Sequence, residues 1–395
     1  MKKTFKILAI LLALTLVLTL FVGCGGDSDD NDGSGDGITK VCLLINGNLG
    51  DKSFFDSAKN GIDMINESNP EIITTVKELG NDASNWESAL REACLSTEKY
   101  DLIIVGTDQM REKLQRIAPQ FPTKSFIIFD SDINKEASRS YSNVYSIMYK
   151  QNEGSFLAGV LAASWLNALQ NGQAVQKAGF VGGMNTDIIK DFAIGYYKGI
   201  EYVNNLNSYG TTKTFVSYVG GFSDSVTGKS QALSQYNAGA SIIFQAASQS
   251  GLGCIDAAKQ LNANGLTKYI IGVDSDQNEY YSNGDTKDPD KAACIVTSVL
   301  KRVDLSLKQA VLAYHNGNLA LGTVNSLGVA AYIDGEQVIG LAKNDYYNQI
   351  IPQSVRDLVD EAEEKIVGGE ITVPSSYTTS RSDFNDIEDA IKVNG

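Results

Sequence analysis

The chain has 395 residues and a formal net charge of −14 at pH 7, because 33 Lys and Arg stand against 47 Asp and Glu. This balance argues against nucleic acid as a partner, since binding it requires basic side chains to neutralise phosphates. His315 is the only histidine, it lies at the end of a predicted helix, and no Cys-x-x-Cys pair occurs. We therefore expect no zinc site, no histidine-based triad, no disulfide framework and no cofactor.

Residues 1–23 have the features of an export signal. Three lysines precede an almost wholly apolar run over residues 7–22, the arrangement of a signal peptide. The run ends in Phe21-Val22-Gly23-Cys24, which resembles the lipobox of bacterial lipoproteins, where the cysteine is lipidated (palmitate being one such group) after cleavage. A transmembrane helix is the alternative, but the apolar run is shorter than the roughly 20 residues that a span needs.

Residues 25–37 are acidic and lack any large apolar side chain, so they are predicted to form a disordered tether after the lipidated Cys24. Without residues 1–23 the chain keeps 30 basic and 47 acidic residues, a net charge near −17. We expect a soluble body on the outer side of the cell membrane, held there by lipid alone rather than by surface charge.

From residue 38 onward, apolar runs of strand length alternate with helical periodicity. Strands are predicted at residues 41–45, 72–76, 102–105, 125–129 and 144–148, and in a second series at 178–181, 213–219, 241–244 and 269–273. Helices are predicted between them, the longest beginning at Glu153. Continuous apolar strands need helices on both faces, so the pattern predicts two doubly wound α/β lobes with parallel sheets.

The last third of the chain is expected to cross between the lobes and complete them. It has predicted strands at residues 294–298 and 329–333, helices at 300–314 and 351–367, and a short helix in the polar tail beyond residue 372. We expect residues 38–150 plus about 276–320 to form the first lobe, and residues 151–275 plus about 321–395 to form the second.

The first strand leads into a glycine-containing turn and a helix, which is where open α/β sheets hold small polar ligands. Ser53 and Asp56 have the spacing of a capping box at the start of that helix. Phe54 lies in the same turn. It either packs the first helical turn on the core or faces a ligand.

Carboxylates and aromatics recur at equivalent places in the two series. Asp130 and Asp274 each end a strand, while Phe54 and Phe222 each lie in a glycine-bearing loop. Because the carboxyl ends of parallel strands meet at one sheet edge, two lobes facing each other would bring these residues into one cleft. The alternatives are helix capping or turn formation for the acids and core packing for Phe222.

The chain resembles the basic membrane protein family of substrate-binding lipoproteins, whose best-known members are purine nucleoside receptors of ABC transporters. The matching motifs run in family order from about residue 40 to 315: Asp51-Lys-Ser-Phe54, Phe126-Ile-Ile-Phe-Asp130, Asn143-Val-Tyr-Ser, Glu153-Gly-Ser-Phe-Leu-Ala-Gly-Val160, Gly179-Phe-Val-Gly-Gly-Met184, Gly221-Phe-Ser-Asp224, Tyr236-Asn-Ala-Gly-Ala240, Ile271-Gly-Val-Asp-Ser-Asp-Gln277 and Thr297-Ser-Val-Leu-Lys301. The resemblance implies the type I periplasmic-binding-protein fold, with two α/β lobes joined by a three-stranded hinge.

The resemblance also implies a ligand site. The family's purine ring is sandwiched by two phenylalanines, which fall here on Phe54 and Phe222. The expected base contacts are Asn46, Asp130 and either Thr107 or Asp108, and the expected ribose contacts are Asp274, Lys301 and the turn containing Ser248. For Lys301 the alternative is an ordinary surface lysine.

Three departures from the family pattern bear on specificity. Asn46 stands where the family usually has Asp, Phe55 replaces a common Asn, and Ser248-Gln249 replaces a more glycine-rich turn. The first change removes an anion beside the base.

The resemblance thus implies a monomeric, lipid-anchored receptor that binds a purine nucleoside and delivers it to the permease and ATPase of an ABC importer. It implies no enzymatic activity. Three alternatives stay open at this point: a binding protein for a sugar or another small polar metabolite, a sensor or adhesin without a transporter, and a nucleoside hydrolase that uses Asp130 and Asp274.

Overall fold

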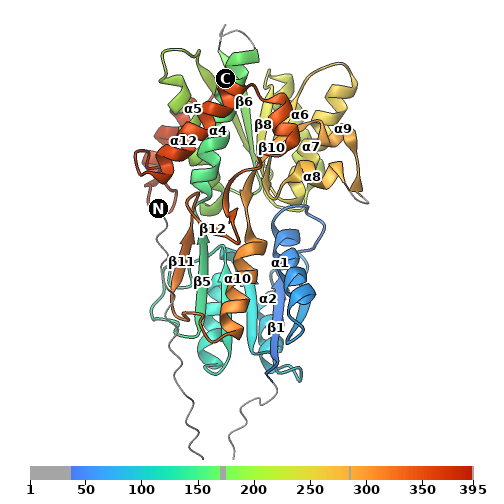
Figure 1. The fold of residues 1–395 in the computed structure, drawn as a ribbon, viewed down its shortest axis with the longest axis vertical. Helices are drawn as coiled ribbons and strands as arrows, with labels where there is room; N and C mark the ends of the chain where they lie inside the picture. Colours follow the sequence, from blue (N-terminus) through green and yellow to red (C-terminus); the bar gives the residue numbers. More distant parts are fainter. Residues whose placement is uncertain (1–36, 170–174, 284–285, 394–395) are drawn as a thin grey trace, which may run out of the picture. The chain divides into compact units, whose positions relative to one another are not determined.

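The computed structural model describes residues 37–169, 175–283 and 286–393 (Figure 1). The predicted signal peptide, Cys24 and most of the predicted tether lie outside the described residues. Among the residues that are described, no helix is long and apolar enough to cross a membrane.

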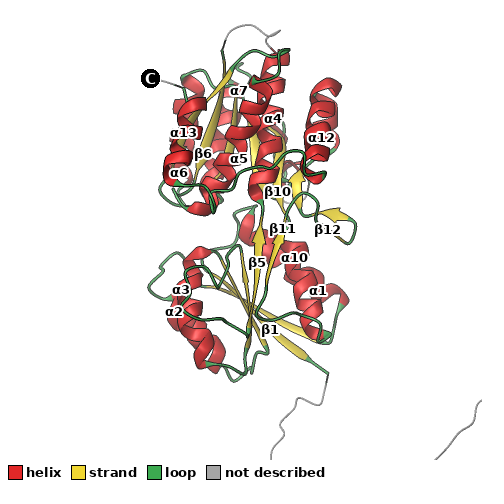
Figure 2. Ribbon diagram, turned by 90° about the vertical axis from the view of Figure 1, so that its left-hand side faces the viewer, coloured by secondary structure: helices red, strands yellow, loops and turns green. Residues whose placement is uncertain are grey.

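The first lobe is built on a six-stranded parallel sheet with the order β11-β5-β4-β3-β1-β2. Its strands are β1 (Thr39–Ile45), β2 (Ile72–Glu78), β3 (Leu102–Gly106), β4 (Ser125–Phe129), β5 (Val144–Tyr149) and β11 (Val324–Leu327). Helices α1 (Phe54–Ser68) and α10 (Val303–His315) cover one face, and α2 (Trp86–Leu95) and α3 (Asp108–Ile117), with a 3-10 turn at Ala118–Gln120, cover the other (Figure 2). Both faces of the strands are therefore buried, as their unbroken apolar runs predict.

The second lobe has a six-stranded sheet with the order β14-β10-β9-β8-β6-β7. Its strands are β6 (Gln176–Gly182), β7 (Thr212–Tyr218), β8 (Ile242–Ala246), β9 (Tyr269–Asp274), β10 (Ile295–Lys301) and the antiparallel edge strand β14 (Ile339–Leu341). Figure 1 shows α4 (Gln151–Leu169), α5 (Asp187–Asn204) and α12 (Gln353–Val367) on one side of it, and α6 (Ser225–Asn237), α7 (Gln249–Ala263), α8 (Gln277–Ser282) and α9 (Pro289–Ala292) on the other. The remaining elements are the short hairpin β12 (Tyr332–Ile333) and β13 (Glu336–Gln337), and helices α11 (Asp345–Ile350) and α13 (Arg381–Ile391).

Helices α4 and α5 pack unusually closely. A Cβ atom at Gly159 would overlap the carbonyl oxygen of Tyr196, and one at Gly199 would overlap that of Phe156. Only glycine permits this approach of two backbones. The contact holds the N-terminal turns of α5 in place, and those turns line the cavity described below.

The chain crosses between the lobes three times: from β5 into α4, from β10 into α10, and from β11 through the hairpin into β14. The expected type I periplasmic-binding-protein architecture, with two lobes and a three-stranded hinge, is confirmed.

Two details of the expected organisation are wrong. Strand β10 was expected in the first lobe with residues 276–320, but it pairs with β9 in the second sheet, and only α10 from that stretch packs on the first lobe. The strand expected at residues 329–333 is reduced to β12, and the lobe-completing strand lies earlier, at β11, in the first sheet rather than in the second lobe expected for residues 321–395. Two of the four β11 residues are polar and only Leu327 is buried, as suits a sheet edge, whereas Val329 is buried outside any strand and Ile333 lies in the short hairpin strand β12.

Candidate functional site

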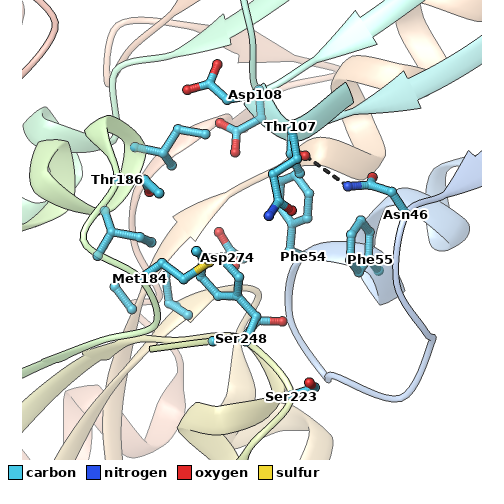
Figure 3. Close-up of a pocket in the computed structure, with 18 of the residues that line it drawn as sticks. Asn46, Phe54, Phe55, Thr107, Asp108, Met184, Thr186, Ser223, Ser248 and Asp274 are labelled. Atoms are coloured by element: carbon cyan, nitrogen blue, oxygen red, sulfur yellow. Dashed lines mark hydrogen bonds between the residues drawn. The ribbon is translucent and has the colours of Figure 1, made fainter. Parts of the chain in front are cut away.

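A cavity of about 270 Å³ lies at the carboxyl edges of both sheets. The nine residues predicted to bind ligand all line it: Asn46, Phe54, Thr107, Asp108, Asp130, Phe222, Ser248, Asp274 and Lys301. Figure 3 shows Asn46 and Phe55 on one side of the cavity and Met184 and Thr186 on the other. The structure thus brings together residues separated by more than half of the chain, although their contacts with a ligand stay a prediction.

Four of these residues have a left-handed backbone at the ends of central strands. The φ angles are 69° for Thr107, 60° for Asp130, 49° for Ser248 and 65° for Asp274. Such angles are uncommon outside glycine, and for the β-branched Thr107 they are a true outlier. Strained residues of this kind cluster at ligand sites, where the surrounding fold over-determines them. Here the strain turns each side chain from the sheet edge into the cavity.

A buried ion cluster lies at the base of the cavity. The Nζ atom of Lys301 is 3.1 Å from Oδ2 of Asp130 and 3.4 Å from Oδ1 of Asp274, and Lys301 is only 2% exposed. The sequence paired Lys301 with Asp274; the structure adds Asp130 from the other lobe. The alternative of a surface lysine is therefore wrong.

The environment of this cluster decides its charges. Burial raises the pKa of Asp130, and the attraction of Lys301 opposes that rise only in part. Burial by itself lowers the pKa of Lys301, but the two carboxylates overcome it and hold the pKa above its usual value. The ammonium also lies 4.6 Å from the ring centre of Phe54 and 5.1 Å from that of Phe192. Lys301 is therefore a cation whose position is fixed by two carboxylates and two aromatic rings.

Polar groups of the first lobe line the upper part of the cavity in Figure 3. The Nδ2 atom of Asn46 donates to Oγ1 of Thr107 at 3.0 Å, which leaves the buried Oδ1 of Asn46 without a hydrogen-bond partner among the described residues. The Asp108 carboxylate accepts hydrogen bonds from Nη1 of Arg111 and Oγ of Ser131, both at 2.8 Å. Its charge is therefore compensated, and Asn46 carries no charge at all.

The two predicted aromatics differ in how they are held. Phe54 is 7% exposed and packs against Phe129 and Phe55, with ring centres 5.3 and 5.2 Å apart, so it is both a core residue and a wall of the cavity. Phe222 is only half-buried. A Cβ atom at Gly183 would overlap the Phe222 ring, so the glycine makes room for that ring at the cavity wall.

The predicted capping box is wrong. Ser53 precedes α1 but its side chain makes no capping hydrogen bond. Instead, Asp51 accepts hydrogen bonds from the backbone amides of Ser53, Phe55 and Asp56 at 3.0–3.1 Å. The Ser53 hydroxyl donates to Oδ2 of Asp274 at 2.6 Å, a partner 221 residues away that local spacing does not reveal.

Several lining residues were missed from sequence. They are Phe55, Asn81, Trp86, Gln109, Met184, Thr186, Ile188, Ile189, Phe192, Gly221, Ser223, Ala246 and Val273. Most of them follow a strand of either sheet. The rule that the carboxyl ends of parallel strands meet at one sheet edge, which located Asp130 and Asp274, applies to them as well. Trp86 was interpreted only as the apolar side of a helix; it is buried, yet it also lines the cavity.

The histidine and the described cysteines have structural surroundings. His315 is the last residue of α10, and its ring Nδ1 lies 2.8 Å from Oγ1 of Thr39. The four described cysteines are free and buried, and burial raises the pKa of both Cys42 and Cys94 to about 11, which makes these thiols inert. Among the described residues, no group of His, Cys, Asp and Glu side chains is arranged to hold a metal ion.

Known proteins place this architecture in a family. Residues 38–377 match the family model described as "ABC transporter substrate-binding protein PnrA-like". The chain belongs to this family. It is 31% identical over 338 residues to Basic membrane protein A of Borreliella afzelii, covering 86% of this chain and 92% of that protein. It is 30% identical over 298 residues to the ABC transporter nucleoside-binding protein BmpA of Lactococcus lactis subsp. cremoris, covering 75% and 76%.

Solved structures of solute-binding proteins agree with the fold. An ABC transporter solute-binding protein from Aeropyrum pernix K1 superposes with a TM-score of 0.76 at 25% identity, covering 90% of this chain and 97% of that one. A Bacillus halodurans solute-binding protein crystallised with myo-inositol has a TM-score of 0.54 at 13% identity, which shows the fold alone. As a PnrA-like protein, the chain is an extracytoplasmic substrate-binding protein of an ABC transporter rather than an enzyme.

Proposed function

We propose that this protein binds a purine nucleoside in the cavity between its lobes and presents it to the permease of an ABC importer. The observation that carries the proposal is the combination of aromatic walls from both lobes with a buried carboxylate–lysine–carboxylate cluster. A nucleoside is a flat, uncharged ring joined to a diol, and this lining offers complementary groups for both parts.

The aromatic walls suit a base. Phe54 comes from the first lobe and Phe222 from the second, so a planar ring between them would contact both lobes at once. Offset stacking contributes about 0.5–1.5 kcal/mol per aromatic pair beyond the area that it buries. Because each lobe supplies one ring, such a ligand binds the closed arrangement better than an open one, and this differential affinity drives closure.

The polar groups suit a diol and exclude a phosphate. Lys301 is the only cation among the described residues that line the cavity, and it is already shared by Asp130 and Asp274. A phosphate would find no free positive charge and would face the carboxylates of Asp108, Asp130 and Asp274. Hydroxyl groups, by contrast, donate to carboxylates in charge-assisted hydrogen bonds worth roughly 1.5–3 kcal/mol each.

The relatives support the class of ligand. The Lactococcus lactis protein, 30% identical to this chain, is named as nucleoside-binding. The choice of a purine base rests on the motifs that resemble those of purine nucleoside receptors. In this proposal Asn46 and Thr107 are the uncharged pair that contacts the edge of the base.

The ligand is tested by thermal unfolding and calorimetry on the purified protein. Guanosine, inosine and adenosine are compared with uridine, with guanosine 5′-monophosphate as the charged control, and with ribose and myo-inositol. A ligand present at about 100 times its Kd stabilises the folded protein by about 2.7 kcal/mol. We expect stabilisation by purine nucleosides and none by the monophosphate. Stabilisation by a sugar with no response to any nucleoside would overturn the proposal.

The second part of the proposal concerns attachment: the mature protein is a monomer tethered through lipid on Cys24. The charged, apolar and small-residue pattern of residues 1–24 supports it. We expect Cys24→Ala to release the protein from membranes into the medium without changing ligand affinity. Retention of the variant in the membrane fraction would refute the lipid tether.

A further inference from the structure

The loop between β1 and α1, residues 46–53, contacts the second lobe through buried hydrogen bonds. Asp51 is 1% exposed, and its Oδ2 accepts a hydrogen bond from Oγ of Ser248 at 2.8 Å. Ser53 is fully buried, and its Oγ donates to Oδ2 of Asp274 at 2.6 Å. Both hydrogen bonds join the first lobe to the second.

Weaker contacts flank these two bonds. The carbonyl oxygen of Lys52 accepts a hydrogen bond from Nε2 of Gln277 at 3.2 Å. The Lys52 ammonium lies 5.6 and 5.5 Å from the ring centres of Tyr280 and Tyr281. The carbonyl oxygen of Ser53 accepts from Oγ of Ser275 at 3.3 Å. The whole tip of the loop, Asp51 to Ser53, therefore rests on the second lobe.

Helix capping does not explain this arrangement. The Asp51 carboxylate already accepts hydrogen bonds from three backbone amides at the start of α1, all in the first lobe. The fourth bond of Asp51, and the entire hydrogen bond of Ser53, serve only the contact between lobes. Lys52 and Ser248 also have positive φ angles, 50° and 49°, so the backbone on both sides is strained where the lobes meet.

Burial distinguishes these bonds from the exposed ion pair across the cleft, and they add to the buried Lys301–Asp130 pair that also joins the lobes. Lys135 and Asp187 form an ion pair at 2.8 Å, but their side chains are 27% and 48% exposed. Exposed ion pairs contribute little, because solvent screens them and both side chains lose entropy. The Ser53–Asp274 bond is buried and the Asp51–Ser248 bond is partly buried, so both groups become more hydrated when the lobes separate.

We infer that Asp51 and Ser53, with Ser248 and Asp274, form a latch that holds the lobes closed and sets how long a ligand stays bound. This inference rests on the proposed function for its ligand. The latch residues Asp51 and Ser53 do not line the cavity, so they act as positioning residues. Ser53 fixes the orientation of the Asp274 carboxylate, and Asp51 accepts the hydrogen bond of the Ser248 hydroxyl.

A latch predicts a specific kinetic effect. The ligand enters while the lobes are apart and the latch bonds are absent, so weakening the latch does not lower the association rate. Dissociation requires the latch to open, and a charge-assisted hydrogen bond lost from the closed state raises the dissociation rate about ten-fold. Substituting a residue whose role is confined to the loop should not raise the dissociation rate selectively.

Tryptophan fluorescence can report ligand binding in this protein. Trp86 lines the cavity, while the other tryptophan, Trp165, is buried in α4. Stopped-flow fluorescence with a purine nucleoside gives both rates for Ser53→Ala and Asp51→Asn. The matched control is Asp56→Asn: Asp56 accepts hydrogen bonds from the amides of Gly50 and Lys52 in the same loop, at 2.7 and 2.8 Å, but none from the described residues of the second lobe.

The expected result is a dissociation rate raised about ten-fold in Ser53→Ala and Asp51→Asn, and unchanged in Asp56→Asn. In a double-mutant cycle, Asp51→Asn and Ser248→Ala should be strongly non-additive because they remove the same bond. Additive effects, an equal effect of Asp56→Asn, or a loss confined to association would each overturn the latch. Ser53→Ala removes only a hydroxyl group, so it tests the idea even if Asp51→Asn does not fold.

A second measurement separates this inference from the identity of the ligand. We expect the latch to favour closure without ligand as well, so small-angle scattering of the unlipidated Cys24→Ala protein should give a larger radius of gyration after Ser53→Ala and Ser248→Ala are combined. An unchanged radius would overturn the latch. A larger radius in a protein that binds no nucleoside would overturn the proposed function alone.

Discussion

Substituting Lys301 by Met removes the only cation from the described lining of the cavity while keeping a side chain of similar length. The ammonium is 3.1 Å from Asp130 and 3.4 Å from Asp274, and Lys301 is 2% exposed. Breaking a buried ion pair by removing one partner costs about 3–5 kcal/mol, because the remaining charge is left uncompensated. Two carboxylates lose their partner here, so we expect a loss of about 5 kcal/mol at about pH 8, together with loss of nucleoside binding.

The loss should shrink on acidification, and the sign follows from Asp130. Burial raises the pKa of this carboxyl group, and Lys301 opposes the rise. Without the ammonium, the folded-state pKa moves further above the unfolded value of about 3.9. A carboxyl group of this kind destabilises the fold at high pH, and its penalty disappears as pH falls through the folded pKa towards the unfolded one. The variant should therefore approach the wild type as the pH falls.

Urea unfolding of the wild type, Lys301→Met and the double variant Lys301→Met/Asp130→Asn, at several pH values, measures these differences as shifts in the free energy of unfolding. The double variant should recover part of the loss at about pH 8, because the amide that replaces the Asp130 carboxylate carries no charge. A destabilisation below about 1 kcal/mol, the level of an exposed ion pair, or one that does not change with pH, would refute the buried-charge reasoning.

The remaining predictions concern the aromatic walls and a second buried acid. Phe222→Ala should weaken nucleoside binding at least about ten-fold with little effect on stability. Phe54→Ala should weaken binding and also cost about 3–5 kcal/mol of folding free energy, because Phe54 packs in the core. Equal stability losses in the two variants would contradict this. Gly183→Ala should displace the Phe222 ring and lower affinity, as measured by calorimetry; unchanged affinity would contradict the placement of that ring at the cavity wall. Burial raises the pKa of Asp191 to about 6, so the folded protein loses stability as pH rises from about 4 to 6. Asp191→Asn should flatten this part of the stability profile and raise the free energy of unfolding at neutral pH by up to about 3 kcal/mol; a variant with the wild-type slope would contradict the assignment.

Local pattern predicted most of the secondary structure. Strand β1 was expected at residues 41–45 and extends over Thr39–Ile45, because a continuous apolar run buried on both faces suits only a central strand. The same reasoning failed at β11, whose four residues contain little apolar surface. Its place beside β5 depends on backbone pairing with a strand far away in the chain.

The candidate site was predictable to the extent that parallel sheets gather their carboxyl ends at one edge. This rule, with the family motifs, located the strand-end residues Thr107, Asp130, Ser248 and Asp274. It did not indicate the role of Ser53. Spacing suggested that Ser53 caps its own helix, but the carboxylate of Asp51 satisfies those amides and leaves the Ser53 hydroxyl for Asp274.

The order of residues along the chain was sufficient to determine the alternation of strands and helices, the two lobes and the chemical types of group at the ends of their strands. These follow from hydrophobic periodicity and turn chemistry, which act over a few neighbouring residues. Only the tertiary structure decided that Lys301 lies between Asp130 and Asp274, and that Asp51 bonds to Ser248. Those partners are set by how two independently folded sheets face each other, and periodicity within either sheet contains no information about that arrangement.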